Sequence, residues 1–106
     1  MDEERLAQIQ TILQNHRGRR NPISSSQIAQ TIGIVEDDTH SATRNLIYQC
    51  AQQYRIPLGA TSNGYFIIEN EAELNCYIAN LESRAAGIQE RIRFIQETWR
   101  AQHNEI

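Results

Sequence analysis

Residues 56–68 read IPLGATSNGYFII, and this stretch decides the fold class. Apolar and small residues lead up to the pair Asn63-Gly64, and a second apolar run follows it. An Asn-Gly pair between two such runs predicts a β-hairpin, because both residues accept a positive φ. Two strands alone are barely stable in water, so the hairpin must pack on helices. The side chains expected to cover those helices are Ile56, Leu58, Phe66 and Ile68.

Two helices are expected first. One, over residues 2–16, follows three acidic residues that favour a helix N-terminus and carries apolar residues at helical spacing. A short helix comes after the basic loop HRGRRNP; Ser24 or Ser25 caps it, and it ends near Gly33. The apolar positions of the two helices are Leu6, Ile9, Ile12, Leu13, Ile28 and Ala29.

A third helix is expected between the acidic turn IVEDDTHS and the hairpin. Asp38 or Thr39 is its predicted N-cap, and Pro57 is expected to close it. Residues at helical spacing make one face suited to burial, and they are Thr43, Leu46, Ile47, Cys50 and Tyr54.

A long helix is expected after the hairpin, from about residue 71 to about residue 102. Its apolar positions follow one another at alternating steps of 4 and 3 residues, which is the pattern of a coiled-coil seam. We expect the chain to form a homodimer through residues 78–99 of this seam, either parallel or antiparallel. The alternative is that the helix folds back onto the first helix of its own chain. The seam consists of Leu74, Ile78, Leu81, Ala85, Ile88, Ile92, Ile95 and Trp99.

Three segments resemble a winged helix-turn-helix protein. ISSSQIAQTIGI is similar to the first helix and turn of that motif, and LIYQCAQQYRIPLGATSNGYFII to the recognition helix and wing of biotin-ligase repressors. ENEAELNCYIANLESRAAGI resembles the helix after the wing in small bacterial and prophage winged-helix proteins. The resemblance covers residues 23–95. It implies a winged helix-turn-helix domain over residues 1–69 and a dimerisation helix over 70–106 in the same compact unit.

The same resemblance implies binding to double-stranded DNA, as a small dimeric transcriptional regulator or a phage-type accessory factor. Arg and Asn suit the edges of guanine and adenine, so we expect the third helix to read bases. The wing tip and the basic loop are expected to contact phosphates. The expected DNA-binding residues are Arg19, Arg20, Ser25, Gln27, Ser41, Arg44, Asn45, Tyr48, Thr61, Ser62 and Asn63.

One feature departs from that family. The turn before the third helix is longer than usual and carries Glu36, Asp37 and Asp38, and the net charge of the chain is −3. Carboxylates at this place would repel phosphates. The alternative function is therefore a winged-helix module that binds a protein through residues 36–38 and does not bind DNA.

Other classes of protein find little support. The chain has no nucleophile–base pairing, no Gly-rich phosphate loop and no His or Cys spacing typical of zinc, so we expect no enzyme activity, cofactor or metal. No apolar run approaches the length of a membrane span, and the acidic N-terminus lacks a signal-peptide pattern, so a cytoplasmic protein is expected. Cys50 and Cys76 are expected to be structural.

Overall fold

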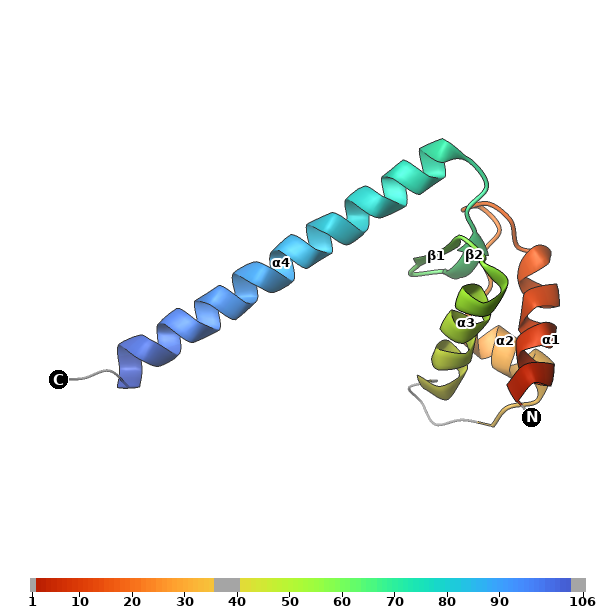
Figure 1. Ribbon diagram of the computed structural model, residues 1–106, viewed down its shortest axis with the longest axis horizontal. Helices are drawn as coiled ribbons and strands as arrows, with labels where there is room; N and C mark the ends of the chain where they lie inside the picture. Colours follow the sequence, from red (N-terminus) through yellow and green to blue (C-terminus); the bar gives the residue numbers. More distant parts are fainter. Residues whose placement is uncertain (1, 36–40, 104–106) are drawn as a thin grey trace. The chain divides into compact units, whose positions relative to one another are not determined.

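The computed structural model describes residues 2–35 and 41–103. Helices precede and follow one antiparallel hairpin in the predicted order, so the fold is mostly α with a single hairpin (Figure 1). No helix in the described part of the chain is long and apolar enough to cross a membrane. The elements are α1 (Asp2–Gln14), α2 (Ser25–Ile32), α3 (Ser41–Tyr54), β1 (Leu58–Thr61), β2 (Gly64–Ile67) and α4 (Glu71–His103).

The chain divides into two compact units, Met1–Glu73 (the N-terminal unit) and Leu74–Ile106 (the C-terminal unit). The division falls in the first turn of α4. The boundary lies there because the Glu73 carboxylate accepts hydrogen bonds from the backbone N–H groups of Arg19 and Glu69. This first turn therefore belongs to the N-terminal unit.

The core of the N-terminal unit lies between the three short helices and the hairpin. Most of the predicted faces of α1 and α3 is buried: Leu6, Ile9 and Leu13, and the four α3 residues Thr43, Leu46, Ile47 and Cys50. The other two predicted members, Ile12 and Tyr54, are only half-buried and pack against the core. The Cys50 thiol donates to the Leu6 carbonyl at 3.4 Å, and burial raises its pKa to about 11. At neutral pH it is a protonated, small apolar side chain that joins α3 to α1.

α2 is closed at both ends by local hydrogen bonds. Ser24 is the N-cap, as predicted, and it forms a capping box with Gln27. At the other end Gly33 adopts φ 77°, and the Ile34 N–H reaches the Ala29 carbonyl at 2.9 Å. This is the pattern of a Schellman motif, in which a left-handed residue satisfies the last carbonyls of the helix.

α3 ends earlier than its proline. The helix stops at Tyr54 because Arg55 is left-handed, with φ 56°, and the Ile56 N–H then bonds to the Ala51 carbonyl at 2.9 Å. Pro57 follows the helix end without causing it. The predicted N-cap, Asp38 or Thr39, lies outside the described residues.

The hairpin is confirmed, but its corner differs from the predicted one. Thr61 pairs with Gly64, so Ser62 and Asn63 are the two loop residues. Among the described residues the only non-glycine with a positive φ is Arg55, so Asn63 does not adopt the expected conformation. Gly64 has φ 134°, and a Cβ added there would lie 2.3 Å from the Ile23 carbonyl oxygen. Glycine is required here mainly for close backbone approach.

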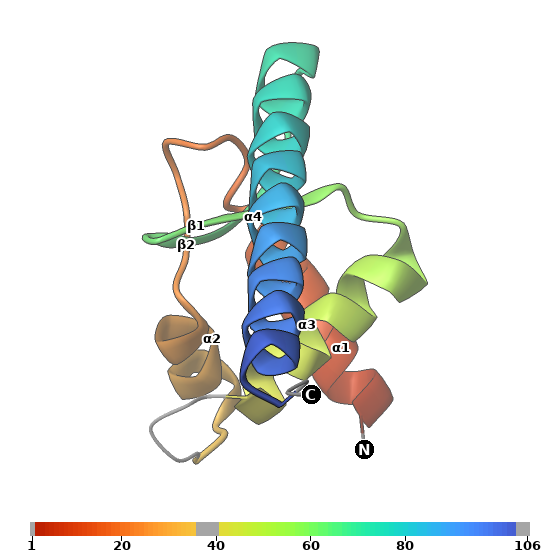
Figure 2. The same cartoon turned by 90° about the vertical axis from the view of Figure 1, so that its left-hand side faces the viewer.

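Ile23, which lies so close to Gly64, belongs to a segment whose sequence has no strand pattern. Residues 16–23, between α1 and α2, run beside β2 (Figure 2). Tyr65 and Ile23 exchange two backbone hydrogen bonds, of 2.7 and 2.8 Å, and the Ile67 backbone bonds to His16 and Gly18 at 2.9 and 2.8 Å. β2 is thus paired on both sides, which stabilises a hairpin of only two short strands.

The two faces of the hairpin are not used as predicted. Tyr65 and Ile67 belong to the core cluster, and Leu58 and Ile56 pack against it. Phe66 points to the opposite face, where it is 2% exposed and its ring lies over Gly59. Phe66 was therefore wrongly assigned to the helix-facing side, since neighbouring strand residues point to opposite faces. Ile68 is half-buried beyond the strand end.

Candidate nucleic-acid interface

The outer face of α3 is polar and exposed. Ser41, Asn45 and Tyr48 are exposed there, opposite the buried face, and Arg44 is exposed beside them. Gln52 is exposed on the same line, four residues beyond Tyr48, and sequence reasoning missed it. The i, i+4, i+7, i+11 spacing that places it on this face was available in the sequence.

Tyr48 connects the outer face of α3 to the hairpin. Its ring meets the Tyr65 ring edge-to-face, with centroids 6.2 Å apart and planes at 87°. Tyr65 is buried, whereas Tyr48 keeps 51% of its surface exposed. The contact orders the Tyr48 side chain while leaving much of its surface available to a ligand.

The tip of the hairpin lies beside the start of α2, because Gly64 is in backbone contact with Ile23 and Ser24. Ser62 and Asn63 are exposed at the tip, and the Thr61 hydroxyl accepts a hydrogen bond from the Asn63 N–H at 3.1 Å.

The two predicted α2 residues differ in their freedom to bind a ligand. The Gln27 side-chain oxygen accepts hydrogen bonds from the N–H and hydroxyl of Ser24, so it is occupied by the cap. Ser25 is half-buried. The structure therefore leaves the exposed tip residues in a better position for external contacts than Ser25 and Gln27.

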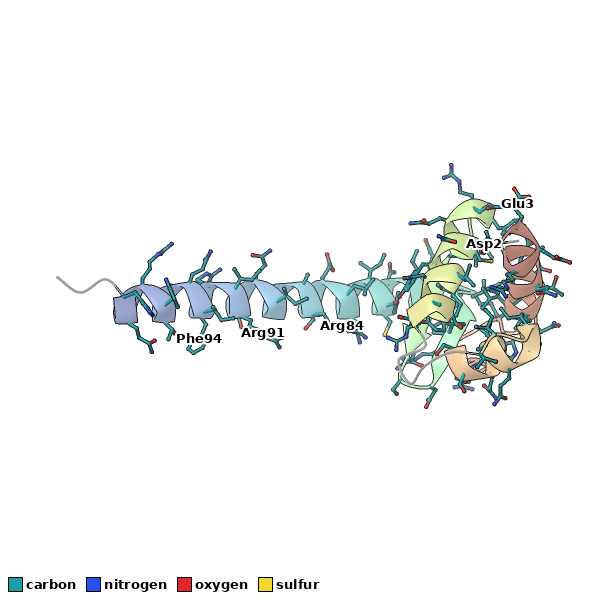
Figure 3. The ribbon with its side chains drawn as sticks, turned by 90° about the horizontal axis from the view of Figure 1, so that it is seen from below. Asp2, Glu3, Arg84, Arg91 and Phe94 are labelled. Carbon is teal, nitrogen blue, oxygen red and sulfur yellow. The ribbon has the colours of Figure 1, made fainter. Side chains whose placement is uncertain are left out.

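The charge distribution separates this surface from the rest of the unit. α2, α3 and the hairpin contain no Asp or Glu, and Arg44 gives α3 a positive charge. In the described part of the N-terminal unit, all carboxylates lie at the starts of two other helices, and Asp2 and Glu3 project from α1 into solvent (Figure 3). These carboxylates are Asp2, Glu3, Glu4, Glu69, Glu71 and Glu73.

The basic loop occupies the other end of the hairpin. Arg17 pairs with Ile67 at the end of β2, whereas the tip adjoins Gly64, so Arg19 and Arg20 are separated from the tip by the length of the strand. Both arginines are exposed. The predicted phosphate contacts therefore do not all lie together. The hairpin tip is close to α2, whereas Arg19 and Arg20 lie at the opposite end of the hairpin.

Glu73 holds this basic loop against the start of α4. Its carboxylate accepts from the Arg19 N–H at 3.0 Å and from the Glu69 N–H at 2.9 Å, while its own N–H donates to the Asn70 side chain at 2.9 Å. The two backbone N–H groups, that of Arg19 first, lower the pKa of the Glu73 carboxyl, and the positive charge of Arg19 adds to this.

We predict that the loop anchor weakens in acid. A carboxyl whose pKa is lowered in the folded state stabilises that state at neutral pH, and this contribution is lost as the pH falls through the lowered value, below 4.5. The amide NMR shifts of Arg19 and Glu69 should titrate together in this range. They should not do so in Glu73→Gln, whereas Glu71→Gln should behave like wild type. Unchanged titration in Glu73→Gln would contradict the assignment of the anchor.

The predicted seam forms one exposed apolar stripe on α4. None of its members is buried within the described chain, and the exposed fraction of the large ones runs from 38% at Leu74 to 62% at Trp99. The Trp99 ring stacks on His103, with centroids 3.6 Å apart. Such a stripe exceeds what soluble monomers usually expose.

No cluster of three or more His, Cys, Asp or Glu side chains suited to a metal occurs among the described residues. Neither Cys50 nor Cys76 forms a disulfide. The acidic residues 36–38, the predicted protein-binding turn, lie outside the described residues. Comparison with family models, curated proteins and solved structures finds no significant match to this chain.

Proposed function

We propose that this chain is a DNA-binding protein of the winged helix-turn-helix type, in which α3 enters the major groove. The observation that carries the proposal is the surface formed by α2, α3 and the hairpin: within the bounds of these described elements there is no Asp or Glu, and exposed side chains are able to read bases. A polar helix of 14 residues with one apolar face is the element that such proteins place in the groove.

The exposed side chains suggest a division of roles. Arg44 suits guanine, and Asn45 and Gln52 suit adenine, because each can form two hydrogen bonds to the base edge. Tyr48 is positioned to contact a thymine methyl or a phosphate. The side chains of Ser62 and Asn63, exposed at the wing tip, are suited to the phosphate backbone, which positions the protein without reading sequence.

The arginine loop has a lesser role in this proposal. Glu69 and Glu73 lie beside Gly18, with the nearest carboxylate oxygen 3.3 Å from where a Cβ would stand. These carboxylates offset part of the positive charge of Arg19 and Arg20. We assign the two arginines to phosphate contacts at the edge of the site, where each contributes to the salt dependence of binding.

Arg44→Ala tests the reading of bases. We expect it to reduce specific binding by about 1–3 kcal/mol and to relax the preference at one base pair. Arg5→Ala is the matched control, because it removes the same charge from an exposed position on α1. Fluorescence anisotropy on random DNA and on DNA upstream of the encoding gene, over a salt series, would measure both. An equal loss of DNA affinity in the two variants would indicate that Arg44 contributes only its charge and reads no base.

The proposal fails if the wild-type protein binds no DNA at low salt. The second candidate is then a protein-binding module, which is favoured by the net charge of −3 and by Glu36, Asp37 and Asp38 directly before α3. Neutralising those three residues would distinguish the two functions. If the protein binds DNA, the carboxylates should repel it, so their neutralisation should tighten DNA binding. If the protein binds a protein partner instead, the carboxylates should hold that partner, so their neutralisation should weaken its binding.

We further propose that the protein acts as a homodimer in the cytoplasm, as a transcriptional regulator or phage-type accessory factor. The exposed stripe of α4 supports the dimer, since a second copy offers the same apolar surface. Two cysteines that form no disulfide suit a reducing compartment.

A further inference from the structure

The sides of the α4 seam carry an asymmetric set of residues. In heptad terms Ile78, Ala85, Ile92 and Trp99 occupy position a, and Leu74, Leu81, Ile88 and Ile95 occupy position d. Arg84 and Arg91 project from the same side as Phe94 (Figure 3) and flank the seam. The opposite flank carries Glu82, Gln89 and Gln96.

We infer that α4 pairs with α4 of a second copy in the antiparallel direction. The inference deepens the proposed dimer and rests on it. In a parallel pair each seam residue faces itself, whereas in an antiparallel pair position a faces position d. The seam residues therefore differ in how well they fill the two arrangements.

The sizes of the seam residues favour the antiparallel pair. A parallel pair places the smallest residue, Ala85, opposite itself and the largest, Trp99, opposite itself, which makes one layer too narrow and another too wide. In the antiparallel pair Ala85 faces Ile88 and Trp99 faces Leu74. The layers then differ less in size than in the parallel pair, which favours close packing.

The ends of α4 also match in this register. The same alignment that sets Ala85 against Ile88 sets Glu71 beside Gln102, so nearly all of the 33 residues of α4 overlap. A shift by one heptad in either direction would leave about two turns unpaired at one end of each helix. A shallow hollow lined by Ile95, Gln96, Trp99 and Arg100 lies at the level that Leu74 of the second copy reaches.

One interaction opposes this arrangement. Antiparallel pairing brings Arg84 of one copy beside Arg91 of the other, twice per dimer, whereas parallel pairing places each arginine beside a glutamine. An exposed pair of like charges is screened by salt and has a weaker effect than seam side chains that lose their packing partners. Packing therefore decides the direction.

Cysteine cross-linking of the full chain distinguishes the directions. In a Cys76→Ser background, Ile78→Cys and Ile95→Cys should form a disulfide-linked dimer only when the two variants are mixed. Each variant alone should not, because antiparallel pairing separates the two copies of residue 78 by roughly 25 Å. Leu81→Cys with Ile92→Cys is a second pair, and Ser83→Cys, on the outer face, is the control that should not cross-link.

A charge exchange gives an independent readout. Arg84→Glu should tighten the antiparallel dimer about tenfold in sedimentation equilibrium, since it turns two like-charge pairs into two opposite-charge pairs. Added salt should strengthen the wild-type dimer. In a parallel dimer the same substitution faces Gln89 and should change little.

Cross-linking of each single variant alone would establish a parallel pair and overturn the inference. A monomeric wild type, with no cross-link from either cysteine pair, would also overturn it. Neither outcome decides whether the N-terminal unit binds DNA, which the anisotropy series measures separately. A cross-linked antiparallel dimer that binds no DNA would overturn the proposed function and leave this inference in place.

Discussion

Ile88→Asp/Ile92→Asp is expected to be a monomer at concentrations where the wild-type protein forms the proposed dimer. The two side chains lie near the middle of the apolar stripe and are 55% and 45% exposed in the single chain. Dimer formation would bury four carboxylates without partners. Each loses water at a cost of several kcal/mol, so we expect the dissociation constant to rise more than a thousandfold, by about 4 kcal/mol or more.

Ala79→Asp/Ala86→Asp is the matched control, because it adds the same charge to α4 outside the seam. It should remain dimeric in sedimentation equilibrium. Dimerisation should also tighten binding to a two-half-site DNA, so the seam variant should bind such DNA more weakly while keeping a folded N-terminal unit. A wild-type protein that is monomeric at every concentration would end the dimer hypothesis.

Gly64→Ala is expected to lower the free energy of unfolding of the N-terminal unit by about 3 kcal/mol or more. One cause is φ 134°, a conformation that L side chains rarely adopt. The larger cause is the Ile23 backbone, 2.3 Å from the new Cβ, which must move away and release the hydrogen bonds between Ile23 and Tyr65. Urea denaturation of wild type and variant measures the difference.

Two other glycines separate these causes. Gly33→Ala introduces the unfavourable φ of 77° with nothing within 4 Å of the new Cβ, so it should cost only about 1 kcal/mol. Gly87→Ala, in α4 with open space around it, should be neutral or should stabilise the helix by up to about 1 kcal/mol. A Gly64→Ala effect no larger than that of Gly33→Ala would show that the contact with Ile23 relaxes freely.

The sequence by itself determined the elements whose signals are local. Helix periodicity located the buried face of α1 at Leu6, Ile9 and Leu13, and the Ser24 cap and Gly33 marked the ends of α2. The alternating steps along α4 identified its apolar stripe. These signals depend on residues within one or two helical turns of each other, so they can be read without a partner segment.

The candidate site was predictable to the same extent. The exposure of Ser41, Arg44, Asn45 and Tyr48 follows from helical spacing alone, and Gln52 could have been found in the same way. The edge-to-face contact of Tyr48 with Tyr65 could not, because it joins residues from different elements. The anchoring of Arg19 by Glu73 joins residues 54 positions apart.

Only the tertiary structure decided how the hairpin is held. The segment that pairs with β2 has no strand pattern of its own, since Arg17 and Ile23 contribute single bridges on either side of a turn. The backbone of this segment comes so close to Gly64 that only a residue without a Cβ fits there. The local Asn-Gly pattern had suggested a different reason for the glycine, namely the positive φ of a hairpin turn. The segment also sets Tyr65 and Ile67 toward the core and Phe66 away from it. Hydrogen bonds between backbones depend on which segments lie side by side in the folded chain. The identity of the side chains predicts such pairing only weakly.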